Sequence, residues 1–242
     1  MRRTLPIAAL IVLAAAPVLA QQSGPFPGSP VDRATMRLGE RVEELFEEKE
    51  YERAFFIYRN ELAPIGDKYA QYMVGFMYET GTWVDEDPLL ASAWYRLAAE
   101  RGYVEFEQVR DALLNSFTPV DQARSDALYL QLRREYSDVV LLLKLIEQDM
   151  NAMTARTGSR LSGGTGPVTI VDPRAGSSVS GDEYFRVLRS RIEGRLQFMS
   201  QQLGDASIVT EADDVDIEEL SARVDRFVET IDDRTVVVDA DP

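Results

Sequence analysis

The chain has 242 residues, contains no cysteine and no histidine, and carries a formal net charge of −15. Its acidity argues against a nucleic-acid partner, because the phosphate backbone would be repelled. Without cysteine or histidine there is no Cys–His or Ser–His catalytic pair and no zinc site built from these ligands. The glycine-rich segment at 163–166 lacks the lysine of a phosphate loop. The composition therefore predicts neither a cofactor nor a metal site.

The first 20 residues have the features of a secretory signal peptide. A basic start precedes an apolar stretch over residues 5–19, and small residues ending at Ala20 suit cleavage. The alternative is an uncleaved anchor, but the short apolar stretch and the cleavage site favour export. Residues 21–33 would then form a flexible leader. We expect a periplasmic protein, with secretion as the alternative and no integral membrane span after cleavage.

Residues 34–117 are predicted to form helix pairs, and the clearest pair lies between residues 70 and 102. Apolar residues recur at helical spacing in its first half, and Gly81 ends that helix. Asp87 and Pro88 can open the second helix, because aspartate caps free N–H groups and proline suits the first helical position. Such a pair cannot bury its apolar face alone, so it implies stacked neighbours.

This segment resembles a Sel1-like repeat, a bacterial relative of the tetratricopeptide repeat. Two positions depart from the family pattern. Trp83 stands where the family usually has glycine, so the loop is not expected to keep its usual conformation. Leu90 stands where the family usually has a charged residue. The resemblance implies a short α-solenoid and a role in binding other proteins. The positions that fall on the family pattern are Ala70, Gly75, Tyr78, Gly81, Val84, Asp87, Ala91, Trp94, Tyr95, Ala98, Ala99 and Gly102.

A partial copy of the repeat lies upstream. Gly66 and Gly102 are 36 positions apart, a plausible repeat length, and residues 36–48 and 51–58 resemble the two helices of an earlier unit. Residues 102–117 resemble the first helix of a further, degenerate unit. Since about three units are usually needed for stability, a solenoid this short needs a cap.

Residues 118–204 are predicted to supply that cap. Thr118 and Pro119 have the residue types that open a helix. A second helix over 138–156 is apolar on most sides, which predicts burial, yet it is too short and too interrupted to span a membrane.

A glycine- and serine-rich loop is expected at 157–182, with a short β-strand or hairpin at 167–173. Residues 172–181 would be a second stretch of loop. Capping-box spacing at residue 180 then opens a helix that Gly204 stops. The predicted core face of this helix consists of Tyr184, Val187, Leu188, Ile192 and Leu196.

Residues 205–242 read as an acidic tail, with thirteen Asp or Glu residues against three Arg. One amphipathic helix is expected inside it, from the spacing of Ile217, Leu220, Val224, Phe227 and Ile231. The hypothesis is either an arm that docks a partner or covers the protein itself, or a solubilising tail. In both cases, removal of residues 205–242 is predicted to leave the core folded.

The predicted fold class is therefore mainly α: a short α-solenoid of helix pairs with a helical C-terminal cap. The favoured function is a non-catalytic scaffold or adaptor in the bacterial cell envelope, which binds another envelope protein or peptide through Gln71, Tyr72, Met73 and Trp83. One alternative is a carboxylate-based enzyme acting on envelope polysaccharide, with Glu79 as the best candidate for one of its two carboxylates and Trp83 as a platform for sugar stacking. The other is a structural subunit of an envelope complex.

Overall fold

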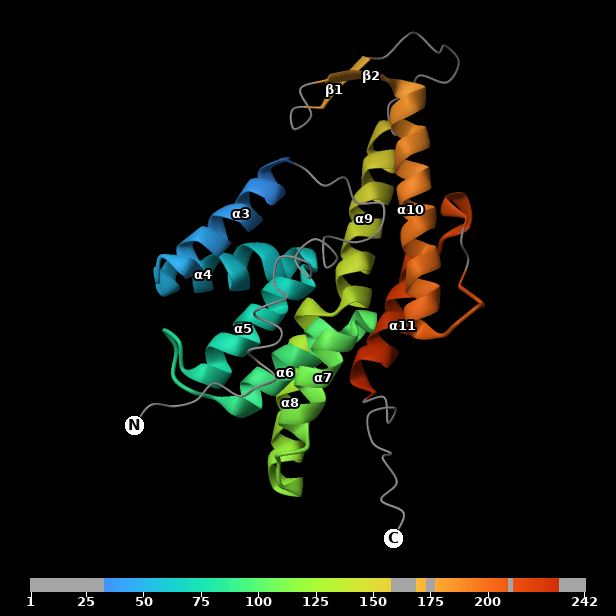
Figure 1. Ribbon diagram of the computed structural model, residues 1–242. Coiled ribbons are helices and arrows are strands. Elements are labelled where there is room, and N and C mark those ends of the chain that lie inside the picture. Colours follow the sequence, from blue (N-terminus) through green and yellow to red (C-terminus); the bar gives the residue numbers. More distant parts are fainter. Residues whose placement is uncertain (1–32, 158–168, 173–176, 209–210, 231–242) are drawn as a thin grey trace. The chain divides into compact units, whose positions relative to one another are not determined.

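The structure is a computed structural model that describes residues 33–157, 169–172, 177–208 and 211–230 (Figure 1). The predicted signal peptide and nearly all of the predicted leader lie outside these residues. The described residues fall into two compact units, which are treated separately. Residues up to Val140 together with those from Val224 belong to the first unit, and residues from Leu141 to Arg223 belong to the second.

The first unit is a stack of helices, and both predicted helix pairs are present. Helix α3 packs on α4, α5 packs on α6, and α6 also packs on α7 and α8 (Figure 1). Helix α8, the start of the predicted cap region, packs on α6 within the first unit, whereas residues from Leu141 of that region belong to the second unit. The elements are α3 (Arg33–Glu47), α4 (Tyr51–Ile57), η1 (Tyr58–Leu62), η2 (Ala63–Ile65), α5 (Lys68–Thr80), α6 (Pro88–Ala98), η3 (Ala99–Arg101), α7 (Val104–Leu114) and α8 (Pro119–Tyr136).

The helix ends of this unit follow from local capping chemistry. The Asp87 side chain accepts a hydrogen bond from the Leu90 amide at 2.9 Å and caps α6. Thr118 caps α8 in the same way, and each of these helices begins with a proline. Gly81 ends α5 with a φ of 64°, the left-handed conformation that costs glycine little. The predicted caps are confirmed.

Close approach between α5 and α6 explains the glycine at position 75. A Cβ atom placed on Gly75 would lie 2.8 Å from the Tyr95 ring, nearer than atoms can pack. The Tyr95 ring also stacks on Tyr72, with ring centroids 5.4 Å apart, and Tyr72 stacks on Phe106 at the same distance. The glycine therefore lets an aromatic column form between the helices of the repeat.

We expect Gly75→Ala to destabilise the protein by about 1–3 kcal/mol, because the added methyl group overpacks this contact. Alanine is otherwise the better helix former by roughly 1 kcal/mol. Gly39→Ala in α3 is the matched control, since nothing lies within 4 Å of a Cβ there. Urea unfolding should show a loss for Gly75→Ala and a small gain for Gly39→Ala; equal effects would contradict the packing argument.

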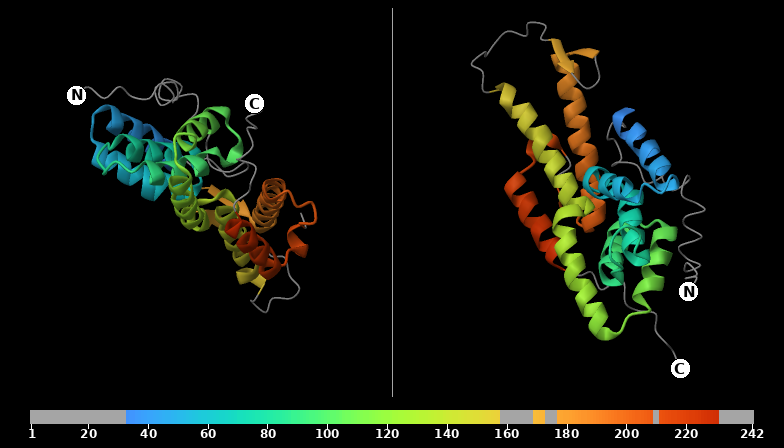
Figure 2. Two further views of the ribbon diagram at one scale, coloured as in Figure 1. Left: turned by 90° about the horizontal axis from the view of Figure 1, so that it is seen from below. Right: turned by 90° about the vertical axis from the view of Figure 1, so that its left-hand side faces the viewer.

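The second unit contains long helices and a hairpin. Strands β1 (Thr169–Asp172) and β2 (Ser177–Ser180) pair antiparallel, with Ile170 opposite Val179. The hairpin lies at the start of α10 (Figures 1 and 2). The expected strand is present, but β2 occupies residues that the sequence predicted as loop. The other elements are α9 (Asp138–Thr157, which begins in the first unit), α10 (Gly181–Leu203), η4 (Ala212–Asp214) and α11 (Ile217–Glu229, which ends in the first unit).

The buried face of α10 differs from the predicted one at a single clear position. Leu188, Ile192, Leu196 and Met199 are buried and form one stripe at helical spacing. Val187 is 42% exposed, so its assignment to the core was wrong. It lies one position, or about 100°, away from Leu188 in the stripe, which places it on the exposed side of the helix.

The predicted tail is part of the folded structure as far as residue 230. Leu220, Val224 and Val228 of α11 are buried, as is Ile208 before it. The interpretation of residues 205–242 as a detachable acidic tail is therefore wrong for its described part. The acidic residues line the exposed face of an amphipathic helix, and the apolar face is covered.

Deletion of residues 205–242 is now expected to destabilise the protein, because it uncovers the apolar surface that these side chains bury. The point variant Leu220→Ala should cost about 2–5 kcal/mol, whereas Val187→Ala at an exposed helical site should stay within about 0.5 kcal/mol. Chemical denaturation of the three proteins checks this. A truncated protein as stable as the full chain would restore the tail interpretation.

Candidate interaction surface and buried ion cluster

The structure buries most of the predicted docking residues. Gln71, Tyr72 and Met73 have no exposed surface, and every residue from Lys68 to Met77 is buried. A helix covered on all sides cannot offer a concave face to a partner. The prediction that these three residues bind a partner is wrong, because periodicity located the apolar stripe of α5 but did not show that neighbours also cover its other side.

Trp83 remains accessible, with 56% of its surface exposed in the turn between α5 and α6. Its φ is 70°, in the left-handed region that glycine adopts easily and bulky residues rarely do. The turn thus takes a glycine-like conformation at this position although tryptophan occupies it. Such strain costs of the order of 1–3 kcal/mol and tends to occur at functional positions. Leu90, the second departure from the repeat pattern, packs against the core.

We expect Trp83→Gly to raise the free energy of unfolding by about 1 kcal/mol, because glycine relieves the positive-φ strain. Trp83→Ala keeps a Cβ atom and therefore keeps the strain. Thermal melts of the two variants separate backbone strain from loss of the indole ring. If both variants melt together, the strain at Trp83 is negligible.

Glu79, the candidate acid of the enzyme alternative, has a structural contact. Its Oε2 atom accepts a hydrogen bond of 2.6 Å from the Tyr95 hydroxyl. The carboxylate thereby joins α5 to α6. Among the described residues, no group of three or more Asp or Glu side chains is arranged to hold a metal ion.

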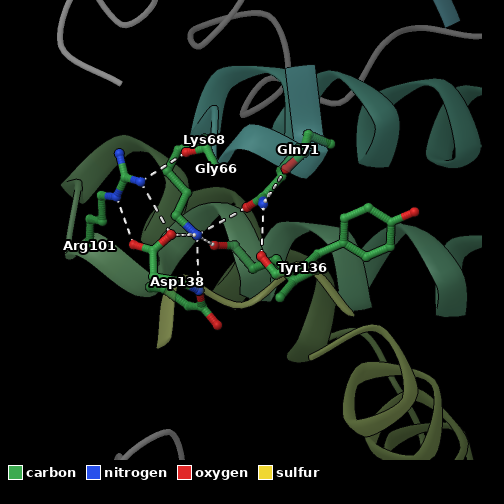
Figure 3. Close-up of polar contacts among 9 residues, drawn as sticks. Gly66, Lys68, Gln71, Arg101, Tyr136 and Asp138 are labelled. Atoms are coloured by element: carbon green, nitrogen blue, oxygen red, sulfur yellow. Dashed lines mark hydrogen bonds and ion pairs between the residues drawn. The ribbon is translucent and has the colours of Figure 1, made fainter. Parts of the chain in front are cut away.

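The most polar part of the interior is an ion cluster centred on Lys68 (Figure 3). The Lys68 Nζ atom has no exposed surface and lies 2.8 Å from Glu100 Oε2 and 2.9 Å from Asp138 Oδ1. It also donates to the Leu97 carbonyl at 2.8 Å and to Gln71 Oε1 at 3.1 Å. One lysine therefore connects the first turn of α5 with η3 and with the start of α9.

Arg101 completes the cluster. Its Nε atom donates to Asp138 Oδ2 at 2.7 Å, and its Nη2 atom donates to the Gly66 carbonyl at 2.8 Å (Figure 3). Each buried cation thus has a carboxylate partner and further hydrogen bonds, as a buried ion pair requires. The predicted site residues included none of these four charged groups, because they are brought together from positions 68 to 138.

The two carboxylates of the cluster have pKa values shifted in opposite directions. Burial raises the pKa of Glu100, although the nearby Lys68 charge opposes this. Burial would also raise the pKa of Asp138, but the charges and hydrogen bonds of Lys68 and Arg101 outweigh it and hold that pKa below its usual range. The charged groups of the cluster are buried and paired with one another, so we interpret the cluster as a structural tie.

The stacked helix pairs define a helical repeat protein. Residues 68–103 match the Sel1 repeat family, so the chain carries a Sel1 repeat over α5 and α6. Sel1 repeats generally mediate protein–protein interaction. No curated protein and no solved structure matches the chain. None of the described helices is long and apolar enough to cross a membrane.

Proposed function

We propose that this protein is a non-catalytic scaffold that binds a partner protein through the turn carrying Trp83. The observation that carries the proposal is an exposed tryptophan held in a strained backbone conformation within a Sel1 repeat. Aromatic side chains of this size dominate the binding energy of many interfaces. If the turn only connected two helices, glycine at position 83 would adopt this backbone conformation without strain.

A photo-crosslinking amino acid at position 83 tests this proposal in cells. Val120 is the matched control position, because it is an apolar residue that is 62% exposed in the same unit. A discrete adduct to one protein is expected from position 83 and not from position 120. Binding of that protein, once purified, should weaken at least about tenfold in Trp83→Ala. Adducts that are absent, or identical at both positions, would remove the turn as the docking surface.

We further propose that the scaffold works in the bacterial cell envelope after export. Support comes from the basic start, the apolar stretch and the small-residue site before Gln21. Amino-terminal sequencing of the native protein is expected to begin at Gln21, with the protein in the periplasmic fraction. A retained Met1 would count against export, and recovery from the medium would indicate secretion.

The enzyme alternative receives no support from the geometry of Glu79, whose carboxylate is tied to Tyr95. An enzyme would release soluble fragments from envelope polysaccharide when the purified protein acts alone. A structural subunit would instead be unstable without its complex. These outcomes separate both alternatives from a scaffold, which folds alone and retains a defined partner.

A further inference from the structure

Arg133 of α8 is a buried cation that differs from the others in its unit. Only 3% of it is exposed, yet no described residue forms an ion pair with it. By contrast, Lys68 pairs with Glu100, and Arg96 pairs with Asp126 at 2.5 Å. The Nε atom of Arg133 is buried and has no hydrogen-bond partner in this part of the chain. Burying a charge without a counter-charge is costly, so this arrangement needs a reason.

Two aromatic rings and one carbonyl group surround the Arg133 guanidinium. It lies 4.2 Å from the ring centroid of Phe227 and 5.6 Å from that of Tyr129. Its Nη1 atom donates to the Thr230 carbonyl at 2.5 Å. Phe227 lies in the last turn of α11, and Thr230 is the residue that follows this helix. We call the surface made by Tyr129 and Arg133 the arginine slot; the end of α11 covers it.

The end of α11 is an incomplete ligand for this slot. A neutral carbonyl accepts one hydrogen bond, whereas a carboxylate can accept two from the guanidinium fork, with charge assistance. The neighbouring contact adds little, because Arg134 and Glu229 are 3.9 Å apart and both largely exposed. Helix ends also fray more readily than helix centres. The covering turn therefore places an aromatic ring on the guanidinium of Arg133. It supplies no negatively charged group to that guanidinium.

We propose that the arginine slot docks a segment of a partner protein in which an aromatic residue stands next to a carboxylate, and that the end of α11 competes for it within the chain. The aromatic ring replaces Phe227 over Arg133, and the carboxylate takes the Nε and Nη donors. Arg133 supplies a buried guanidinium whose Nε atom has no acceptor among the described residues, so a segment that brings a carboxylate satisfies it. A partner can then bind the arginine slot only when the end of α11 leaves it.

A peptide copying residues 217–230 serves as the probe, made with a free C-terminal carboxylate and, separately, with a C-terminal amide. In the free acid, the carbonyl group of Thr230 that faces Arg133 is replaced by a carboxylate with two oxygen atoms. Binding of both peptides to the full chain is measured by fluorescence anisotropy. Phe227→Ala opens the slot, so we expect it to bind the free acid about tenfold more tightly than wild type does. The amide should bind that variant about tenfold more weakly than the acid.

Control variants test which side chain is responsible. Phe227→Ala combined with Arg133→Gln should lose binding, whereas Phe227→Ala combined with Arg134→Gln should keep it within about threefold. Circular dichroism establishes that each variant is folded. If the variant with Phe227→Ala and Arg133→Gln does not fold, a variant with Phe227→Ala and Arg133→Lys takes its place. Trp83→Ala should leave peptide binding unchanged. Equal binding of acid and amide, or no binding by Phe227→Ala up to about 1 mM peptide, overturns the proposal.

Discussion

Replacement of Trp94 by alanine is expected to lower the free energy of unfolding by about 3–5 kcal/mol. Trp94 is 1% exposed and is the largest fully buried side chain of the described structure. The centroid of its ring lies 4.8 Å from the centroid of the Tyr136 ring, so Trp94 joins α6 to the end of α8. The truncation would leave a cavity that rigid helices on both sides cannot close. Equilibrium denaturation followed by circular dichroism measures the loss.

Trp83→Ala is the matched control for this prediction, because it removes the same side chain from an exposed position of the same repeat. Its effect on stability should stay within about 0.5 kcal/mol. Ala98→Trp should also destabilise, since Ala98 is fully buried and a larger ring overpacks the site. If Trp94→Ala were as stable as Trp83→Ala, the packing of the repeat described above would be incorrect.

Replacement of Lys68 by methionine is expected to cost about 3–5 kcal/mol near neutral pH. The substitution keeps the buried volume but leaves Glu100 and Asp138 facing each other with one cation fewer, and removal of one partner of a buried ion pair is strongly destabilising. Lys144→Met in α9 is the matched control, because Lys144 is exposed. Its effect should stay within about 0.5 kcal/mol. Addition of Glu100→Gln to Lys68→Met should recover part of the loss.

The pH dependence of the Lys68 variant has a defined sign. In the wild type, the pKa of Asp138 is lowered, so its contribution to stability is present above the unfolded pKa of about 4 and is lost as the pH falls through the folded value. Loss of the Lys68 charge raises the folded pKa values of both carboxylates. The stability difference between variant and wild type should therefore shrink as the pH falls toward 4. A difference that stays constant from pH 7 to about 4 would show that these carboxylates do not respond to Lys68.

The strained turn and the arginine slot differ in what covers them. Trp83 is open to solvent, so its binding should depend on the apolar area that a partner buries. Arg133 is covered by the chain itself, so binding there is an exchange whose strength falls with added salt. Salt titration of a purified complex can therefore assign a partner to one surface or the other.

Local sequence determined where most helices begin and end. Asp87 before Pro88, Thr118 before Pro119, and Gly204 after α10 act within a few residues of themselves, so their effect can be predicted without knowing the fold. The Sel1 pattern likewise reports contacts inside one helix pair. These signals sufficed to predict a mainly helical repeat protein, and the 68–103 match agrees with them.

Tertiary structure alone decided which surfaces remain available. Hydrophobic periodicity identifies one face of a helix, but whether neighbours cover the other face depends on segments far away in the chain. Gln71 is therefore buried although its position beside the apolar stripe predicted a docking surface. Arg133 and Thr230 are 97 residues apart, and no pattern in either segment indicates that they meet. Long-range packing buries Lys68 and Arg133 and leaves Trp83 exposed, because burial is a property of the assembled helices and not of any one of them.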